Sequence, residues 1–240
     1  MEIIVDAGNS FIKVFFLSNL NIAKKIHFSY SEISEFIAEI QLHTDVPIII
    51  SDVSGKINTS ILAQLPSHYF LFDHSHALPI SIEYQTISNL GLDRIANAVG
   101  SVALHPHTNK LIIDLGTAIT IDFVDATNTF KGGIISPGME TRFNSLHTQT
   151  GKLPLISKSE EIHLFAHSTE SAIQSGVIQG ITFELTQYID TYNTIFPDIE
   201  VFLCGGDAFF FEKMLKKTIF AEPNLLALGL QTIYKYNVTK

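Results

Sequence analysis

The sequence predicts an α/β protein built from two similar halves. The first observation is a strand–turn–strand pattern at residues 3–16, where two apolar runs flank a short polar turn. The second is the return of this pattern at residues 111–124. The third is the alternation of strand-like and helix-like patterns over residues 26–81. Because the repeat distance is too long for a solenoid, the duplication predicts two domains, residues 1–109 and 110–240.

The first half opens with an apolar run, Ile3–Val5, that is typical of a strand buried on both faces. This strand ends in Asp6, and a turn with Gly8, Asn9 and Ser10 leads to the second apolar run. We expect Gly8 to adopt a conformation that a Cβ would resist, while Asn9 and Ser10 offer hydrogen-bond donors. The alternative is a β-hairpin whose polar turn is only solvated.

The next elements follow from hydrophobic periodicity. Helices are expected at residues 31–43 and 58–65, and Ser31 is the expected start of the first. Strands are expected at residues 46–53 and 68–74.

In the second half, the strand at 111–114 ends in Asp114, and Gly116 and Thr117 follow. Backbone amides in such turns form nests that bind anions. Two turns facing each other could therefore hold a polyphosphate, with Asp6 and Asp114 placed for cations rather than for the phosphates. The alternative is that Asp114 and Thr117 only form the turn.

A long helix is expected at residues 170–196, followed by a buried strand that runs into a Gly–Gly turn at 201–206. The helix contains Gly176 and Gly180. Since glycine costs roughly 1 kcal/mol within a helix, these two residues suggest close packing against another backbone or a ligand.

Composition limits the classes of partner. The 240 residues are 46% hydrophobic and 16% charged, as in a folded globular protein. No apolar stretch approaches the roughly 20 residues that cross a bilayer and no secretory signal is recognisable, so we expect no membrane partner. The single cysteine, Cys204, favours the cytoplasm. A net charge of −9 with scattered Lys and Arg argues against nucleic acid.

Five segments, taken in this order, make the chain resemble the type III pantothenate kinase family. They are "DAGNSFIK" at 6–13, "GLDR" at 91–94, "DLGTAIT" at 114–120, "GGIISPG" at 132–138 and "FLCGGDA" at 202–208. The resemblance covers nearly the whole chain. It places the protein in the superfamily of acetate and sugar kinases, actin and heat-shock chaperone ATPases. It implies two ribonuclease H-like domains, each a mixed sheet flanked by helices, with an ATP cleft between them.

The activity implied by this resemblance is ATP-dependent phosphorylation of pantothenate to 4′-phosphopantothenate, the first step of coenzyme A biosynthesis. A homodimer is implied as well. The implied ATP-binding residues are Asp6, Ala7, Gly8, Asn9, Ser10, Phe11, Ile12, Lys13 and Thr117. Asp6 would lie near magnesium, and Asp114 would hold a monovalent cation, potassium or ammonium. Ser10 stands where threonine is usual and keeps the hydroxyl.

The resemblance also implies a pantothenate site. Its residues are Tyr84, Gly91, Leu92, Asp93, Arg94 and Thr169. Asp93 would accept the proton of the attacking hydroxyl, and Arg94 would bind an anionic or carbonyl group of pantothenate. Taken without the family, Asp93 could be a helix cap, Arg94 a surface ion-pair partner and Tyr84 a core or edge-strand aromatic. Cys204 stands where the family often has threonine, and its own chemistry indicates a small buried residue.

Two rival functions remain. One is a regulatory protein of the same fold, such as an accessory factor for transcription, that uses the nucleotide as a switch. The presence of Asp93 argues against it, since a switch needs no base for a substrate. The other is a kinase or phosphatase acting on a sugar or polyphosphate, and the pairing of Asp93 with Arg94 favours an acidic substrate instead.

Overall fold

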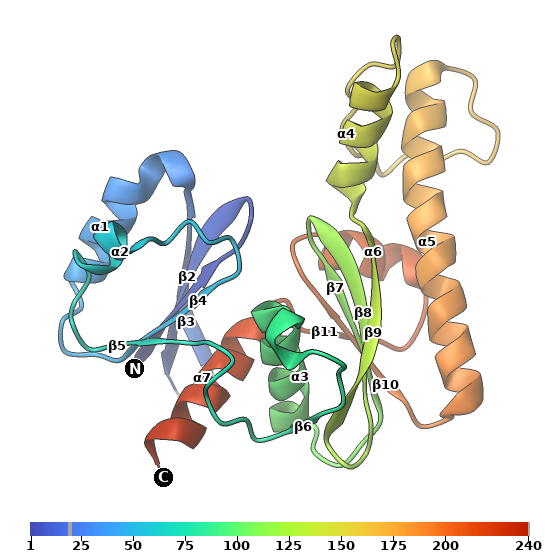
Figure 1. Ribbon diagram of the computed structural model, residues 1–240. Helices are drawn as coiled ribbons and strands as arrows, with labels where there is room; N and C mark the ends of the chain where they lie inside the picture. Colours follow the sequence, from blue (N-terminus) through green and yellow to red (C-terminus); the bar gives the residue numbers. More distant parts are fainter. Residues whose placement is uncertain (19–20, 240) are drawn as a thin grey trace. The chain divides into compact units, whose positions relative to one another are not determined.

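The computed structural model describes residues 1–18 and 21–239, and the chain forms two compact units (Figure 1). The first unit contains Met1–His107, Thr127–Lys131 and Asn224–Lys240, and the second contains Thr108–Ala126 and Gly132–Pro223. The chain first passes from the first unit to the second after His107, two residues before the boundary that was expected after residue 109. Two later segments return to the first unit.

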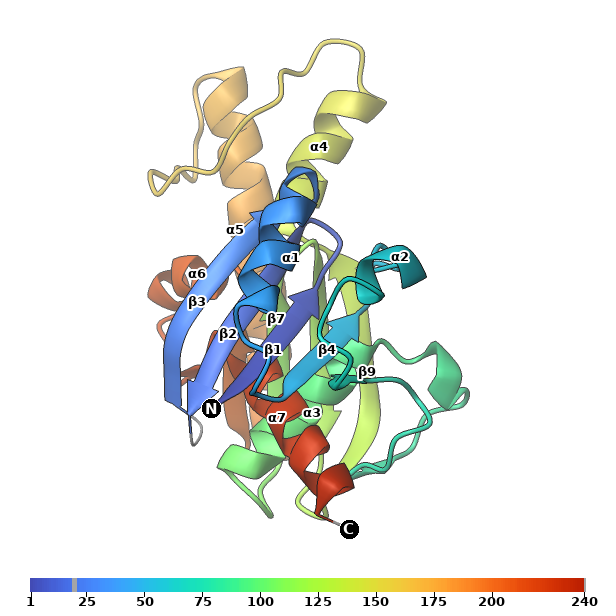
Figure 2. The same ribbon diagram turned by 90° about the vertical axis from the view of Figure 1, so that its left-hand side faces the viewer.

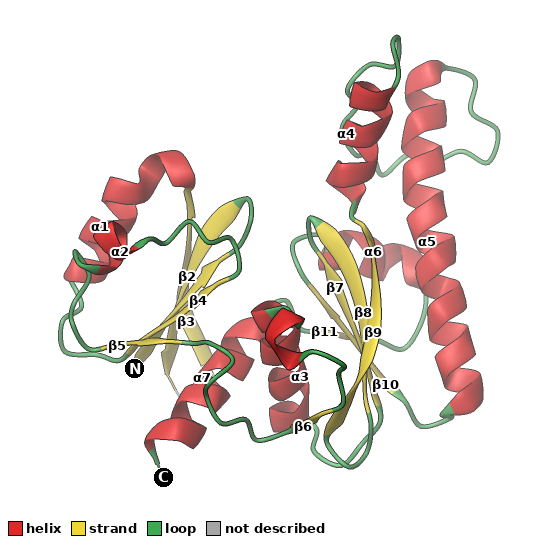
Figure 3. Ribbon diagram, in the orientation of Figure 1, coloured by secondary structure: helices red, strands yellow, loops and turns green. Residues whose placement is uncertain are grey.

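The first unit holds a five-stranded mixed sheet, whose strands are yellow in Figure 3, and the strand order is β3-β2-β1-β4-β5. Its elements are β1 (Glu2–Ala7), β2 (Phe11–Ser18), β3 (Asn21–Ser29), α1 (Ile33–Gln41), β4 (Ile48–Asp52), α2 (Thr59–Leu62), β5 (Tyr69–Leu71), β6 (Ser81–Ile82), α3 (Leu92–Leu104) and α7 (Leu225–Val238), with 3-10 helices at Tyr30–Glu32 and Ile87–Asn89.

The second unit holds most of a six-stranded sheet in the order β11-β10-β7-β8-β9-β6. Its elements are β7 (Lys110–Leu115), β8 (Ala118–Val124), β9 (Thr129–Pro137), α4 (Met139–Gln149), α5 (Thr169–Ile195), β10 (Glu200–Cys204), α6 (Ala208–Leu215) and β11 (Phe220–Ala221). Strand β9 begins in the first-unit segment, where Thr129 and Phe130 pair with β6.

The duplication expected from the sequence is visible in the strand pairing. Strand β1 lies between antiparallel β2 and parallel β4. Strand β7 lies in the same way between antiparallel β8 and parallel β10. The α/β fold with two mixed sheets flanked by helices is therefore confirmed.

Alternation along β1 explains how α1 covers one face of the first sheet (Figure 2). Ile3 and Val5 share a core cluster with Phe36 and Ile40 of α1, whereas Asp6 points to the opposite face. The start of this helical segment differs from the expectation at Ser31. The Ser29 N–H and hydroxyl both bind the Glu32 carboxylate, at 2.8 and 2.7 Å, so the chain turns two residues earlier.

The C-terminal helix α7 belongs to the first unit because it crosses α3 at two glycines. A Cβ added at Gly229 would lie 1.8 Å from the Ala96 oxygen, and one at Gly100 would lie 2.3 Å from the Leu225 oxygen. The two backbones can approach this closely only where neither helix carries a side chain. This crossing assigns the last segment of the chain to the unit that contains its beginning.

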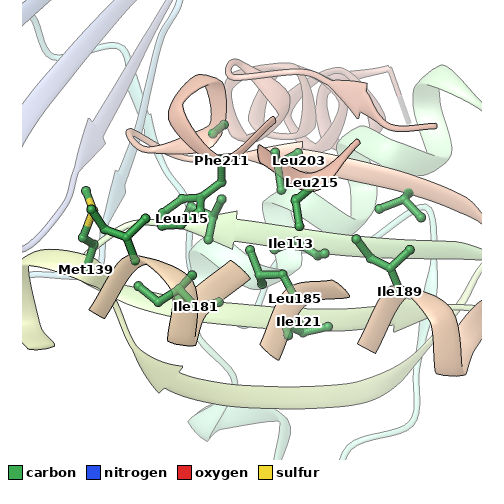
Figure 4. Packing of buried hydrophobic residues seen from close by; sticks show 14 of the residues in the cluster. Ile113, Leu115, Ile121, Met139, Ile181, Leu185, Ile189, Leu203, Phe211 and Leu215 are labelled. Carbon is green, nitrogen blue, oxygen red and sulfur yellow. The ribbon is translucent and has the colours of Figure 1, made fainter. Parts of the chain in front are cut away.

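Helix α5 covers one face of the second sheet, and its apolar stripe packs on β7 and β8 (Figure 4). Ile181, Leu185 and Ile189 are fully buried in this cluster. The helix runs without interruption over 27 residues. The expected close packing of Gly176 and Gly180 against another backbone is wrong, since a Cβ at Gly176 would meet nothing within 4 Å and one at Gly180 would meet only a guanidinium nitrogen at 3.9 Å.

In the part of the chain that the structure describes, no helix is both long enough and apolar enough to span a bilayer.

Candidate active site

The first candidate element is a buried carboxylate at the end of β1. The register pairs Asp6 with Lys13 of β2, and the Lys13 ammonium lies 3.4 Å from Asp6 Oδ2. Asp6 is only 5% exposed. Burial raises the pKa of Asp6, Lys13 opposes that shift, and the charge of Asp93 adds to it. Asp6 and Asp93 are therefore close enough for their charges to interact.

The turn after Asp6 is a tight hairpin. The Gly8 N–H donates to the Phe11 oxygen at 3.0 Å, which leaves Asn9 and Ser10 as the two loop residues. The expectation that Gly8 needs a conformation reserved for glycine is wrong. Its φ lies outside the left-handed region, and an added Cβ would meet only the Phe11 oxygen, at an ordinary 3.5 Å. The reversal falls on the two residues after Gly8, which explains the difference.

The "GLDR" segment forms the start of α3. Gly91 is the N-cap residue, Leu92 begins the helix, and Asp93 is its second residue. The Asp93 Oδ1 accepts a hydrogen bond from the Arg94 N–H at 2.8 Å. Asp93 is thus not the N-cap, although one of its oxygens satisfies an N–H of the first turn. The N-terminal end of the helix also favours its negative charge.

Arg94 is buried, with 5% of its surface exposed, so it is not a surface residue. Its guanidinium carbon lies 5.8 Å from the ring centre of Tyr84 and 5.6 Å from that of Phe130. Tyr84 is 36% exposed, so it is not a core aromatic. The structure therefore brings together Tyr84, Asp93 and Arg94, and the two rings contact the guanidinium.

Phe130 is a residue that the sequence reasoning missed. It reaches Arg94 because β9 pairs with β6 and the segment after it: the Glu83 N–H donates to the Phe130 oxygen at 2.9 Å. The Lys131 ammonium also lies 2.7 Å from the Glu83 carboxylate. No local sequence pattern predicts this strand pairing, because β6 contains only two residues.

The second candidate element is the turn between β7 and β8. Asp114 lies in β7, and the Gly116 N–H donates to the Ala118 oxygen at 3.1 Å. The Thr117 oxygen accepts hydrogen bonds from the Gly138 N–H at 3.0 Å and from the Thr141 hydroxyl at 2.6 Å. The last part of "GGIISPG" therefore helps to hold the turn that carries Thr117.

The Gly–Gly turn after β10 packs against Asp114. Gly205 has φ +90°, and a Cβ there would lie 2.4 Å from Asp114 Oδ1 and 2.5 Å from the Leu115 nitrogen. Both the conformation and the close approach require glycine. Cys204 is buried as expected of a small apolar residue, with its sulfur 3.6 Å from the Ile113 oxygen.

Of the other predicted residues, Ala7 and Ile12 are buried in the core of the first unit, and Thr169 is the exposed first residue of α5 in the second unit. Its neighbour Ser168 caps the helix by accepting the Ser171 N–H at 3.1 Å.

Few side chains of the described residues are placed to bind a metal ion together. Within residues 1–18 and 21–239, no three His, Cys, Asp or Glu side chains gather closely enough to hold a metal ion. A magnesium ion bound mostly by substrate phosphates needs only one or two protein carboxylates. Asp6 fits such a role because a nearby cation would favour its ionised form against the effect of burial.

Comparison with protein families and curated proteins identifies relatives over the full chain. A family model described as type III pantothenate kinase matches residues 2–191. The type III pantothenate kinase of Cytophaga hutchinsonii is 40% identical over 240 residues, covering 99% of this chain and 100% of the relative. That of Azobacteroides pseudotrichonymphae is 38% identical over 241 residues, covering 98% and 97%.

Solved structures share the fold at low identity. A Campylobacter jejuni protein assigned to the Baf family of transcriptional activators has a TM-score of 0.64 at 20% identity, covering 99% of this chain and 100% of its own. The activator of 2-hydroxyisocaproyl-CoA dehydratase from Clostridium difficile, with bound ADPNP, has a TM-score of 0.57 at 13% identity, covering 99% and 96%. These likenesses show the fold alone. The family model and the curated relatives go further, and by them this chain belongs to the type III pantothenate kinase family.

Proposed function

We propose that this protein transfers the terminal phosphoryl group of ATP to pantothenate, forming 4′-phosphopantothenate in the first step of coenzyme A biosynthesis. Family membership supports this activity. The structural observation that carries it is the start of α3, where a carboxylate, Asp93, precedes a buried guanidinium, Arg94, in contact with the Tyr84 ring. To phosphorylate an alcohol that also carries an anionic group, an enzyme needs a base for the hydroxyl and a positive charge for the anionic group.

Asp93 is the proposed general base. One of its oxygens accepts the Arg94 N–H, which fixes the carboxylate, and the other can take the proton of the attacking hydroxyl. Arg94 is proposed to bind the pantothenate carboxylate. The guanidinium contacts two rings, and a planar fork matches a carboxylate better than an ammonium does. Gly91, Leu92, Tyr84 and Thr169 complete the proposed pantothenate site.

The nucleotide is proposed to bind through residues 6–13 and Thr117. Phosphoryl transfer requires positioning and charge neutralisation more than covalent chemistry from the protein. Lys13 supplies positive charge beside Asp6, and the two loop residues of the hairpin supply backbone N–H groups. Magnesium would neutralise phosphate charge beside Asp6, and Asp114 is the proposed ligand of potassium or ammonium.

A coupled assay tests this function directly. ADP formation from ATP should depend on pantothenate, and the phosphorylated product should appear in equal amount. ADP formation that ignores pantothenate, or ATP binding without any turnover, would favour the regulatory alternative instead. Panels of sugars and of polyphosphate serve as the negative acceptors.

The homodimer implied by the family is proposed as well. The second unit exposes large apolar side chains, among them Leu164, Phe165 and Phe183, which are 76%, 77% and 64% exposed. Where such side chains form one contiguous patch, they often mark contact with another chain. Light scattering after size exclusion should give twice the 26.6 kDa chain mass, and a single chain mass would contradict the proposal.

A further inference from the structure

Two side chains outside the predicted nucleotide residues hold the hairpin turn by its carbonyl groups. The Tyr30 hydroxyl donates to the Gly8 oxygen at 2.6 Å. The Lys56 ammonium donates to the Asn9 oxygen at 2.7 Å. The same ammonium lies 4.1 Å from the centre of the Tyr30 ring, so the two side chains also contact each other. The carbonyls of two successive peptide groups are therefore both engaged.

The loop after β4 supports this pair. Asp52 Oδ1 accepts hydrogen bonds from the Ser54 N–H at 2.9 Å and the Ser54 hydroxyl at 2.7 Å, and Oδ2 accepts the Ile57 N–H at 2.9 Å. Ser54 Oγ in turn lies 2.8 Å from the Tyr30 hydroxyl and accepts the Lys56 N–H at 3.1 Å. The network thus holds the Tyr30 hydroxyl and the Lys56 backbone, and the exposed Lys56 side chain is held by its contacts with the Asn9 oxygen and the Tyr30 ring.

The geometry of the peptide group shows what this arrangement does. In a trans peptide the C=O and the N–H point in opposite directions. The Gly8 carbonyl shares its plane with the Asn9 N–H, and the Asn9 carbonyl shares its plane with the Ser10 N–H. Holding the two carbonyls therefore aims the two loop N–H groups away from Tyr30 and Lys56. The Gly8 N–H is already used by Phe11.

We propose that Tyr30 and Lys56 are positioning residues that orient the Asn9 and Ser10 N–H groups toward a phosphate of ATP. This inference rests on the proposed function, because it takes the turn to be a phosphate site. Neither side chain needs to touch the nucleotide. Preorganised N–H groups bind an anion without the cost of ordering the turn when the ligand arrives.

Two conservative variants test the proposal. Tyr30→Phe removes only the hydroxyl, and Lys56→Met keeps the aliphatic stem without the ammonium. The matched controls are Tyr69→Phe in β5 and Lys24→Met in β3. Lys24 has the same kinds of contact away from the turn: its ammonium lies 2.9 Å from the Glu39 carboxylate and 5.0 Å from the centre of the Phe16 ring.

The measurements are the dissociation constant of a nonhydrolysable ATP analogue by calorimetry, the KM for each substrate, kcat and Tm. A hydrogen bond contributes roughly 2- to 12-fold to such an equilibrium. We expect Tyr30→Phe and Lys56→Met each to weaken the analogue and to raise the KM for ATP by about threefold to tenfold. The KM for pantothenate should stay within about twofold, and both controls should match the wild type.

The possible failures are distinguishable. A wild-type protein that does not bind the analogue overturns the proposed function itself. A wild type that binds, together with a Tyr30→Phe variant that binds equally well, overturns the positioning role. A loss confined to Lys56→Met makes Lys56 a direct phosphate ligand and also overturns it. Lower Tm with unchanged KM for ATP would show that the two residues only stabilise the fold.

Discussion

The Lys13 ammonium lies 3.4 Å from the Asp6 carboxylate, yet the pKa of Asp6 is raised because burial outweighs this ion pair. A carboxyl whose pKa is higher in the folded state binds more protons there than in the unfolded chain. The stability it provides is complete below the unfolded pKa of about 3.9 and is lost as pH rises through the folded value. At neutral pH the Asp6 carboxylate therefore destabilises the fold, as expected of a group retained for function.

Asp6→Asn should consequently raise stability while it lowers activity. We expect Tm at pH 7 to rise by about 2–4 °C, the shift that corresponds to about 1 kcal/mol in a chain of this size. The advantage of the variant should shrink as pH falls toward 4, because wild-type Asp6 then becomes neutral. Turnover should fall. Asp45→Asn, at an exposed position, is the control, and a lower Tm for Asp6→Asn would contradict the argument.

Arg94→Lys should affect one substrate and spare the other. Lysine keeps the charge but loses the planar fork that lies against Tyr84 and Phe130. We expect the KM for pantothenate to rise by roughly tenfold or more, with the KM for ATP within about twofold. Arg142→Lys in the second unit is the matched control. Equal losses for both substrates would instead indicate that Arg94 maintains the fold.

The monovalent ion gives a prediction about Asp114. If this carboxylate holds potassium or ammonium beside the ATP phosphates, sodium should support turnover poorly, since ion size determines which ligand geometry fits. Initial rates in potassium, ammonium and sodium chloride at equal ionic strength measure this directly. Equal turnover in the sodium buffer would contradict the proposed role of Asp114 as a ligand of potassium or ammonium.

Lys110 gives a stability prediction that is independent of catalysis. It is buried in β7 and donates to the Thr108 oxygen at 2.7 Å, and burial lowers its pKa to about 8 despite the charge of Glu200. Between this value and the ordinary pKa of about 10.4, the unfolded chain binds more protons than the folded one, so stability rises with pH. Denaturation of the wild type and of Lys110→Met at pH 7.5 and 9.5 measures the effect. The free energy of unfolding of the wild type, relative to the variant, should be higher at pH 9.5, and a difference that does not change with pH would contradict it.

Local patterns predicted the central strands of both sheets but not the strands β3, β6, β9 and β11, nor everything packed against the sheets. The apolar runs around Asp6 and Asp114 predicted two strand–turn–strand units because burial on both faces leaves a continuous hydrophobic signal. The return of α7 to the first unit was not predictable in this way. It depends on Gly100 and Gly229, which face each other only after the chain has folded.

The candidate site shows the same limit. "GLDR" placed Asp93 and Arg94 next to each other, and the structure adds Phe130, which arrives through a strand pairing of two residues. The hydrogen bonds from Tyr30 and Lys56 to the turn could not be predicted either, because a hydrogen bond to a backbone carbonyl requires no particular sequence motif. The sequence therefore singled out residues with distinctive chemistry, but it gave no sign of the side chains that contact them or hold the turn.

Substitution of Asp93 distinguishes most clearly between a structural and a catalytic role. As the second residue of α3 it accepts the Arg94 N–H through one oxygen. Asp93→Asn keeps an oxygen that can accept this bond, and it removes a charge that repels Asp6. The fold should therefore tolerate the change, with Tm unchanged or slightly higher. Glu140→Gln provides the control, since Glu140 is the second residue of α4.

Catalysis should not tolerate it, because an amide cannot take the proton of the pantothenate hydroxyl. General base catalysis contributes about 10²–10⁴-fold, and we expect kcat to fall within that range. Calorimetry with the nonhydrolysable ATP analogue should give an affinity close to that of the wild type, so that the loss can be assigned to the chemical step. A variant that keeps more than about a third of wild-type turnover would lie far outside this range. Asp93 would then be a residue that orients the helix start, and the base would have to be sought among other groups near Arg94.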